Sequence, residues 1–117
     1  MMNRGQVWLM QTNGGDHPCL IISRNAVINK FKTATVAPIS SKKFGGPAKV
    51  SLTTKDGAAY NCAVSLDSIL TVHIEELKHH LWTLTPTKMG EVNEAIRVSL
   101  GLPEAEPSSY ASLIPRF

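Results

Sequence analysis

One histidine stands out as the residue best placed to do chemistry in this sequence. His17 comes directly before Pro18, where a polar loop gives way to an apolar run. An imidazole exchanges a proton near neutral pH, so His17 is a candidate general acid or base. The alternative without a catalytic role is a solvated loop histidine, or one bonded to a backbone carbonyl.

A hydroxyl-rich and basic segment is the second candidate. Ser40 and Ser41 are followed by Lys42 and Lys43, and then by Phe44 in a glycine-rich loop. Hydroxyl groups can donate to a phosphate, lysines attract a polyanion, and an exposed aromatic ring can stack on a base. The alternative is an ordinary turn that carries a solvated pair of charges.

Other polar residues are less decisive. Asp67 could orient His17, accept a hydrogen bond from a base edge, or cap the turn that follows it. His73, His79 and His80 do not form a metal site in our interpretation, because the adjacent pair in a strand points to opposite faces. We therefore expect neither a metal ion nor a cofactor.

Length and composition bound the class of protein. The chain has 117 residues, of which 43% are hydrophobic and 18% charged, which predicts one globular domain rather than a disordered or fibrous chain. No apolar run is long enough to span a bilayer, and the first residues do not resemble a signal peptide, so we expect a cytoplasmic protein. The net charge of +3 is compatible with a polyanionic partner.

Four residues with special side chains are expected in the core. Cys19 and Cys62 lie in apolar stretches without metal-type spacing, which favours buried reduced thiols over a disulfide. Trp8 and Trp82 are more typical of core positions than of base-stacking platforms.

The elements that must position these residues are mostly short strands. Apolar, β-prone runs separated by turn residues predict strands at Gln6–Met10, Pro18–Ser23, Thr33–Ile39, Ala48–Leu52, Ala59–Leu66 and His80–Thr85. Pro38 predicts that the third strand is an edge or ends there. Asp56-Gly57 favours a tight hairpin between the fourth and fifth strands.

The spacing of the apolar residues changes near the end of the chain, from that of strands to that of a helix. Residues 74–78 could form one or two helical turns, and Thr85-Pro86 is typical of an N-cap followed by proline at the first helical position. Met89, Val92, Ile96 and Leu100 share one helix face, and Gly101 ends the helix. The expected fold is mainly β with a C-terminal helix, in the form of a small barrel.

Several motifs in this order resemble one family. They are RGQVW (4–8), HPCLIIS (17–23), VAPISS (36–41), VSLDSILTV (64–72), EELKHHLWTLT (75–85) and KMGEVNEAIRVSLGL (88–102). Together they resemble the MazF/PemK family of toxin–antitoxin ribonucleases. The resemblance implies an SH3-like barrel of the MazF/CcdB plasmid-maintenance toxin fold over residues 1–102, with a Pro/Ser-rich C-terminal tail at 103–117.

The resemblance also implies an activity. Members are expected to be homodimers whose groove binds single-stranded RNA and cuts it at specific sequences without a metal ion, until an acidic antitoxin protein neutralises them. On that basis the catalytic candidates are His17, Ser40 and Asp67. The RNA-binding candidates are Ser41, Lys42, Lys43, Phe44 and Ser65.

The sequence departs from the family pattern at three arginine positions. His17, Ser65 and Leu70 stand where the family, or its PemK-like members, carry arginine. Two alternative functions therefore stay open. One is a non-catalytic toxin of the same fold that acts by protein binding, as gyrase poisons do. The other is a nucleic-acid-binding module without activity.

Overall fold

The computed structural model describes residues 2–41 and 46–104. Within these residues seven strands, two α-helices and three single 3₁₀ turns alternate along the chain. They are β1 (Gln6–Thr12), β2 (Gly15–Ile21), α1 (Asn25–Phe31), β3 (Thr33–Ser40), β4 (Lys49–Leu52), η1 (Thr54–Asp56), β5 (Cys62–Ser65), η2 (Leu66–Ser68), β6 (Leu70–His73), η3 (Ile74–Glu76), β7 (Leu77–Thr83) and α2 (Pro86–Ser99).

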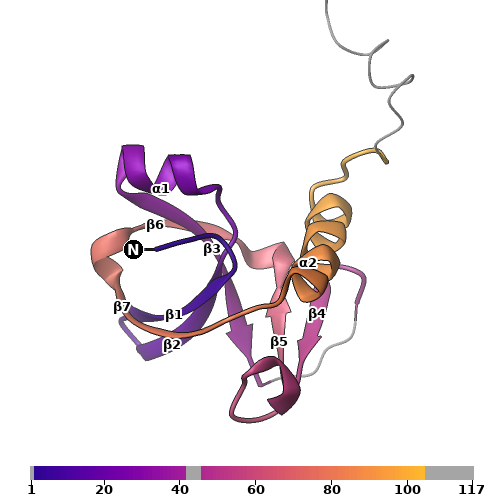
Figure 1. Ribbon diagram of the computed structural model, residues 1–117, viewed down its shortest axis with the longest axis horizontal. Helices are drawn as coiled ribbons and strands as arrows, with labels where there is room; N and C mark the ends of the chain where they lie inside the picture. Colours follow the sequence, from indigo (N-terminus) through magenta and orange to yellow (C-terminus); the bar gives the residue numbers. More distant parts are fainter. Residues whose placement is uncertain (1, 42–45, 105–117) are drawn as a thin grey trace, which may run out of the picture.

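All strand pairs are antiparallel. The order across the sheet is β4-β5-β3-β2-β1-β7, with β6 paired to β3. The sheet curves strongly, with α1 beside β6 at one side and α2 beside β4 at the other (Figure 1). No pairing between the described strands closes the sheet into a complete barrel. The prediction of a mainly β, barrel-like fold with a C-terminal helix is confirmed.

The prediction that Pro38 marks an edge is wrong, because β3 is the central strand. It pairs with β2, β5 and β6. Pro38 lies between Val36, the last partner of β6, and Ile39, the first partner of β5. The amide hydrogen that proline lacks is therefore not needed by either neighbour, and the ladder tolerates proline at this junction.

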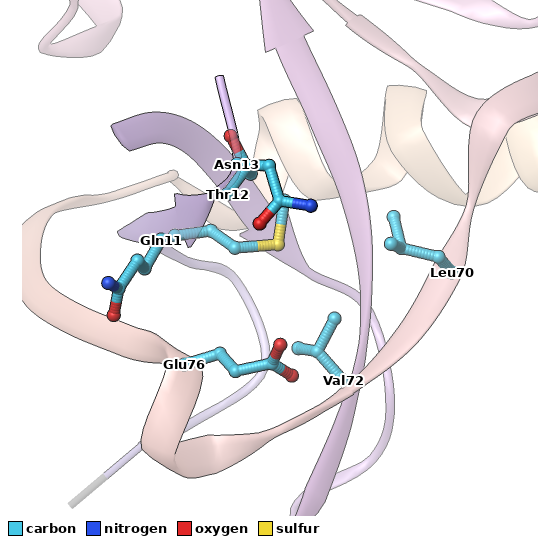
Figure 2. A pocket seen from close by; sticks show the side chains of 7 residues that line it. Gln11, Thr12, Asn13, Leu70, Val72 and Glu76 are labelled. Carbon is cyan, nitrogen blue, oxygen red and sulfur yellow. The ribbon is translucent and has the colours of Figure 1, made fainter. Parts of the chain in front are cut away.

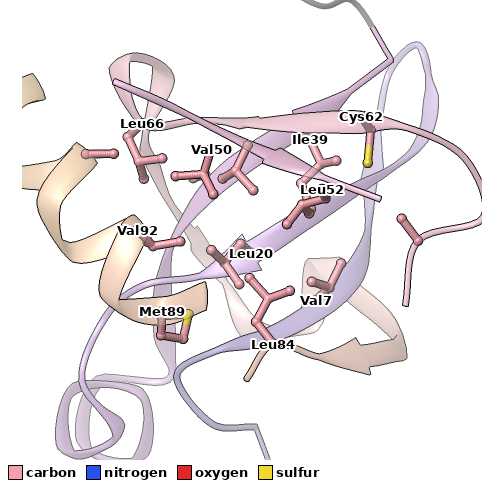
Figure 3. Close-up of a cluster of buried hydrophobic side chains, with 14 residues drawn as sticks. Val7, Leu20, Ile39, Val50, Leu52, Cys62, Leu66, Leu84, Met89 and Val92 are labelled. Atoms are coloured by element: carbon pink, nitrogen blue, oxygen red, sulfur yellow. The ribbon is translucent and has the colours of Figure 1, made fainter. Parts of the chain in front are cut away.

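Two hydrophobic clusters occupy the two faces of this bent sheet. The first, main cluster packs α2 against β1–β5 (Figure 3), and its buried members are Val7, Leu20, Ala37, Ile39, Val50, Leu52, Ala58, Cys62, Val64, Leu66, Leu84, Met89, Val92 and Ala95. The second cluster contains Met10, Cys19, Ile21, Ile28, Ala34, Val36, Val72 and Leu77. Side chains along β3 alternate between them, since successive residues of a strand point to opposite faces.

Helix α2 follows its sequence signals closely. Thr85 is the N-cap, and its Oγ1 accepts a hydrogen bond from the Lys88 amide at 3.2 Å. Met89 and Val92 are buried as predicted, whereas Leu100 is 55% exposed because it comes after the last helical turn. Gly101 has a φ of +68°, the left-handed conformation that commonly ends a helix.

The predicted tight hairpin at Asp56-Gly57 is wrong. The β4–β5 register pairs Leu52 with Cys62, so the connection runs over residues 53–61. Thr53 and Asp56 form a capping box that starts η1, and this turn replaces the hairpin. Gly57 follows with a φ of +104°, and the Trp82 ring covers it so closely that a Cβ would lie 2.7 Å from Trp82 Cδ1.

Two elements were missed and several bounds differ. The sequence patterns did not predict α1, and they placed β6 only within a motif. Strand β1 continues to Thr12 and β2 begins at Gly15, so the hairpin is longer than expected. The strand expected at Ala59–Leu66 spans only Cys62–Ser65, and residues 74–76 form a 3₁₀ turn rather than a longer helix.

The special side chains lie in the two cores. Cys19 and Cys62 are buried and unpaired, as predicted, and burial raises the pKa of the Cys19 thiol to about 12. Trp82 packs on the main cluster and Trp8 on the second, as expected. In the described part of the chain, no helix has the length and apolar character needed to cross a bilayer.

Candidate functional site

The β1–β2 hairpin carries His17 to an exposed position on the face of the second cluster. The two strands turn back at Asn13-Gly14, and the register pairs Met10 with His17. Directly opposed residues of an antiparallel pair share a face, so His17 lies on the side where Met10 is buried. Within the described residues the imidazole makes no hydrogen bond or ion pair, which leaves both ring nitrogens available.

Ser40 lies on the same face of the sheet as His17. The last pair of the β2–β3 register is Cys19 with Pro38, so His17 and Ser40 each lie two residues beyond it, and Ser40 pairs with Ala63 of β5. Pro18 and Ile39, one residue earlier, line a common small pocket, so the strands remain close at this point. Because side chains alternate, His17 and Ser40 share a face and come from positions 23 residues apart in the sequence.

Asp67 and Ser65 lie further back along β3. Ser65 ends β5 and its Oγ is 3.5 Å from Ser68 Oγ, while Asp67 is exposed in η2, which packs against β3. No hydrogen bond joins Asp67 to His17 among the described residues, and Asp67 does not supply a side-chain cap to η2. The β3–β5 register places Ser65 near the level of Pro38, two residues from Ser40.

A pocket of about 420 Å³ opens between the tip of the β1–β2 hairpin, β6 and η3 (Figure 2). We call it the hairpin pocket, and its lining residues are Met10, Gln11, Thr12, Asn13, Leu70, Val72 and Glu76. The apolar side chains belong to the face of the second cluster, and the polar ones come from the hairpin tip and η3. Met10, one of the lining residues, pairs with His17 across β1 and β2, and His17 itself does not line the pocket. An apolar floor with a few polar groups is typical of ligand sites.

Of the other predicted RNA-binding residues, only some lie within the described part of the chain. Ser41 is exposed directly after β3. Lys42, Lys43 and Phe44 lie outside the described residues, so their placement stays a prediction. The structure therefore places His17 and Ser40 on one face, each two residues beyond the last β2–β3 pair, with Ser41 next in the chain, Ser65 at the end of β5 and Asp67 in the turn that follows.

The other three histidines occupy separate positions. His80 stacks on Trp8 with ring centroids 5.6 Å apart, and its Nε2 lies 3.0 Å from Thr83 Oγ1. His79 is the residue before His80 in β7, and the His73 amide donates to Glu76 at 3.0 Å. No group of three or more metal-ligating side chains occurs within residues 2–41 and 46–104.

Sequence reasoning missed the polar lining of the hairpin pocket. Gln11 and Asn13 are ordinary turn-flanking residues, and Glu76 falls in the segment predicted as a helical turn. The sequence signal that could have identified Gln11 and Asn13 is their position at the turn directly before His17. Glu76 is brought in only by the pairing of β7 with β1, which no local pattern reveals.

Curated relatives are similar over most of the chain. The protein is 35% identical over 113 residues to an endoribonuclease MazF from Staphylococcus saprophyticus, with 87% of this chain and 93% of that protein covered. It is 27% identical over 101 residues to a probable endoribonuclease MazF2 from Mycobacterium tuberculosis, with coverage of 86% and 99%.

Solved structures show the same fold. An endoribonuclease from a mycobacterial species, in complex with its cognate antitoxin, superposes with a TM-score of 0.82 at 28% identity, covering 90% of this chain and 100% of that one. The Mycobacterium tuberculosis toxin MazF-mt6 superposes with a TM-score of 0.77 at 24% identity, with coverage of 84% and 98%. The family model of PemK-like, MazF-like toxins matches residues 3–100. The chain therefore belongs to the PemK-like, MazF-like toxin family of type II toxin–antitoxin systems.

Proposed function

We propose that this toxin endoribonuclease cuts single-stranded RNA, including mRNA, at specific sequences and without a metal ion. The reaction is attack of a ribose 2′-hydroxyl on the adjacent phosphorus, with departure of the 5′-oxygen. The observation that supports this most is that the exposed His17 and Ser40 lie on one face of the sheet, each two residues beyond the last pair of β2 and β3.

The reaction needs proton transfer and stabilisation of charge on the phosphoryl oxygens. His17 is exposed and without internal partners among the described residues, so it can take the 2′-hydroxyl proton or supply one to the leaving oxygen. Ser40 is exposed on the same face of the sheet and donates to a phosphoryl oxygen in our proposal. Asp67 is the weaker third candidate, because two strand positions separate its turn from the His17 level.

RNA binding is assigned to the surface that continues from this point. Ser41 follows Ser40 directly, and Ser65 lies near Pro38 on the neighbouring strand. Lys42, Lys43 and Phe44 follow Ser41 in the sequence and would add positive charge and a stacking ring. These assignments rest on residue type and position in the chain.

The proposed assembly is a homodimer that an acidic antitoxin neutralises in the cytoplasm. The antitoxin complex of a mycobacterial relative supports such a partner, and the net charge of +3 favours an acidic one. Residues 1–102 form the toxin domain in this proposal, and residues 103–117 a separate tail. Sedimentation that shows only monomers at tens of micromolar, a concentration range we choose, would count against a shared groove.

The direct test is incubation of the purified protein with a long mixed-sequence RNA in EDTA. We expect discrete fragments from the wild type, few from His17→Ala, and an intermediate amount from Ser40→Ala. His79→Ala is the matched control, because His79 is also an exposed strand histidine but lies on β7 opposite Leu9. The control should cut like the wild type.

Two outcomes would favour another function. Intact RNA together with inhibited DNA supercoiling would favour a toxin that acts by binding gyrase. Intact RNA with salt-sensitive binding to duplex DNA would favour a nucleic-acid-binding module. Cleavage that EDTA abolishes would contradict the proposed metal-independent chemistry.

A further inference from the structure

The polar groups of the hairpin pocket are arranged around one shared space. The Asn13 amide and the Glu76 carboxylate both face the space bounded by Leu70 and Val72, whereas the Gln11 amide points away (Figure 2). The two groups come from opposite walls, the hairpin tip and η3. A flat ligand between them would meet an acceptor-only group on one side and an amide on the other.

The Glu76 carboxylate is held in this orientation by the backbone. Its Oε2 accepts the His73 amide at 3.0 Å, as part of the capping box that starts η3. Each carboxylate oxygen has more than one lone pair, so Glu76 can still accept hydrogen bonds from a ligand. Asn13 makes no side-chain hydrogen bond within the described residues, so its amide is free to donate or accept.

A carboxylate in an RNA-binding groove has a selective effect. It repels phosphate, so it does not contribute to the general attraction between the protein and the RNA backbone. It gains only from a base that presents N–H donors, as carboxylates do when they accept from exocyclic amino groups. Guanine presents two adjacent donors, N1–H and the N2 amino group, beside the O6 acceptor. Uracil presents a single N–H between two carbonyl oxygens.

We propose that the hairpin pocket holds a guanine base, with Glu76 accepting from N1–H and the N2 amino group and Asn13 donating to O6. Glu76 is then the specificity-determining residue of the toxin. The inference rests on the proposed function, because it places the guanine in the RNA substrate. Met10 lines the pocket and is paired with His17, so the guanine belongs to a nucleotide that flanks the cut.

The first experiment maps cut sites on a long mixed-sequence RNA. We expect guanine at one fixed flanking position with wild type, and a drop of about tenfold or more in that preference with Glu76→Gln. The glutamine can still accept the His73 amide, so η3 should persist. Glu75→Gln is the matched control, because Glu75 is exposed on the same turn but does not line the pocket. Cut sites without a fixed guanine, or a preference unchanged in Glu76→Gln, would overturn the inference.

The second experiment separates this inference from the proposed function. Binding of short uridine-rich RNAs that carry one guanine, one inosine or only uridine is followed by fluorescence polarisation. With wild type we expect the guanine RNA to bind about tenfold more tightly than the uridine RNA, and the inosine RNA, which lacks only the N2 amino group, to bind between the two. With Glu76→Gln the difference between guanine and inosine should disappear. This comparison decides the guanine assignment even if the protein cuts no RNA, a result that would refute the proposed cleavage alone. Equal binding of guanine and uridine RNAs by the wild type would refute the guanine assignment.

Discussion

The hairpin end and the α2 end of the molecule use their polar groups in opposite ways. Around α2 the polar side chains are already bonded within the protein: Arg97 pairs with Glu94 at 2.6 Å, and Ser99 Oγ donates to the Leu66 carbonyl at 2.8 Å. At the hairpin end, the His17 and Asn13 side chains are exposed and make no bond within the described residues. Groups without internal partners can engage a ligand without breaking native contacts. Since the proposed function places His17 in the reaction, we call the hairpin end the reactive end and the α2 end the structural end.

The largest expected effect is at the reactive end. His17→Ala should lower the cleavage rate by roughly 10²–10⁴-fold, the usual contribution of one general acid or base, without lowering stability. The wild-type rate should show a limb in its dependence on pH, because His17 transfers a proton in the proposed step, and the variant should lack this limb. A rate series from roughly pH 5.5 to 8.5 measures both.

The arginine that the family carries at this position supplies the matched comparison. His17→Arg should keep RNA binding, because it keeps positive charge, but it should lose the pH limb, because a guanidinium hardly exchanges its proton. Equal rates for wild type and His17→Ala over the whole pH range would remove His17 from the mechanism.

A core substitution should, in contrast to His17→Ala, lower the stability of the protein. Leu52 is 1% exposed in the main cluster, so Leu52→Ala should reduce the free energy of unfolding by about 2–5 kcal/mol. The cut-site sequence of the folded fraction should not change. Urea unfolding measures the loss, and Leu81→Ala, at a residue that is 44% exposed, should change stability much less. A similar loss in both variants would contradict the assignment of the core.

Alanine substitutions at two glycines test how tightly the two regions are packed. Gly57 and Gly15 have nearly the same φ, +104° and +108°, but a methyl group added at Gly57 would meet the Trp82 ring, whereas one added at Gly15 would meet nothing within 4 Å. Gly57→Ala should therefore cost about 2–4 kcal/mol from backbone strain plus the clash, whereas Gly15→Ala should cost only the strain of about 1–2 kcal/mol. Thermal unfolding of both variants measures the difference, and equal losses would contradict the close contact.

The smallest effect is expected at the start of α2. Thr85→Ala removes the acceptor for the Lys88 amide and should cost about 1 kcal/mol. Thr87→Ala is the control, because Thr87 is exposed inside the helix and alanine is the better helix former there. We expect unchanged or slightly raised stability for the control, and a loss as large as that of Thr85→Ala would argue against the cap.

Local signals in the sequence were enough to predict α2 but not α1. Thr85-Pro86 marks the start of α2 by itself. Helix α1 begins after Arg24, which provides no side-chain cap, and its first turn has no acidic residue. Four of its seven residues are apolar, but only Ile28 is buried. A seven-residue segment is also shorter than the window over which apolar periodicity reveals a helix such as α2.

The candidate site was predictable by residue type but not by geometry. His17 and Ser40 could be nominated from their side chains and from the family resemblance. That they lie on one face of the sheet follows from the β2–β3 register, which pairs residues far apart in the chain. Glu76 reaches the hairpin pocket through long-range pairing alone, so its contribution had no local signal.

The position of β3 has a consequence for how the molecule unfolds. Ala34 and Val36 of this strand belong to the second cluster, and Ala37 and Ile39 belong to the main cluster. Neither cluster can lose β3 without disrupting the other, so both should melt in one cooperative transition. Amide protons along β3 should then exchange with solvent only through global opening, while those at the hairpin tip exchange through local fluctuations. The reactive end can thus fluctuate without unfolding the domain that carries it.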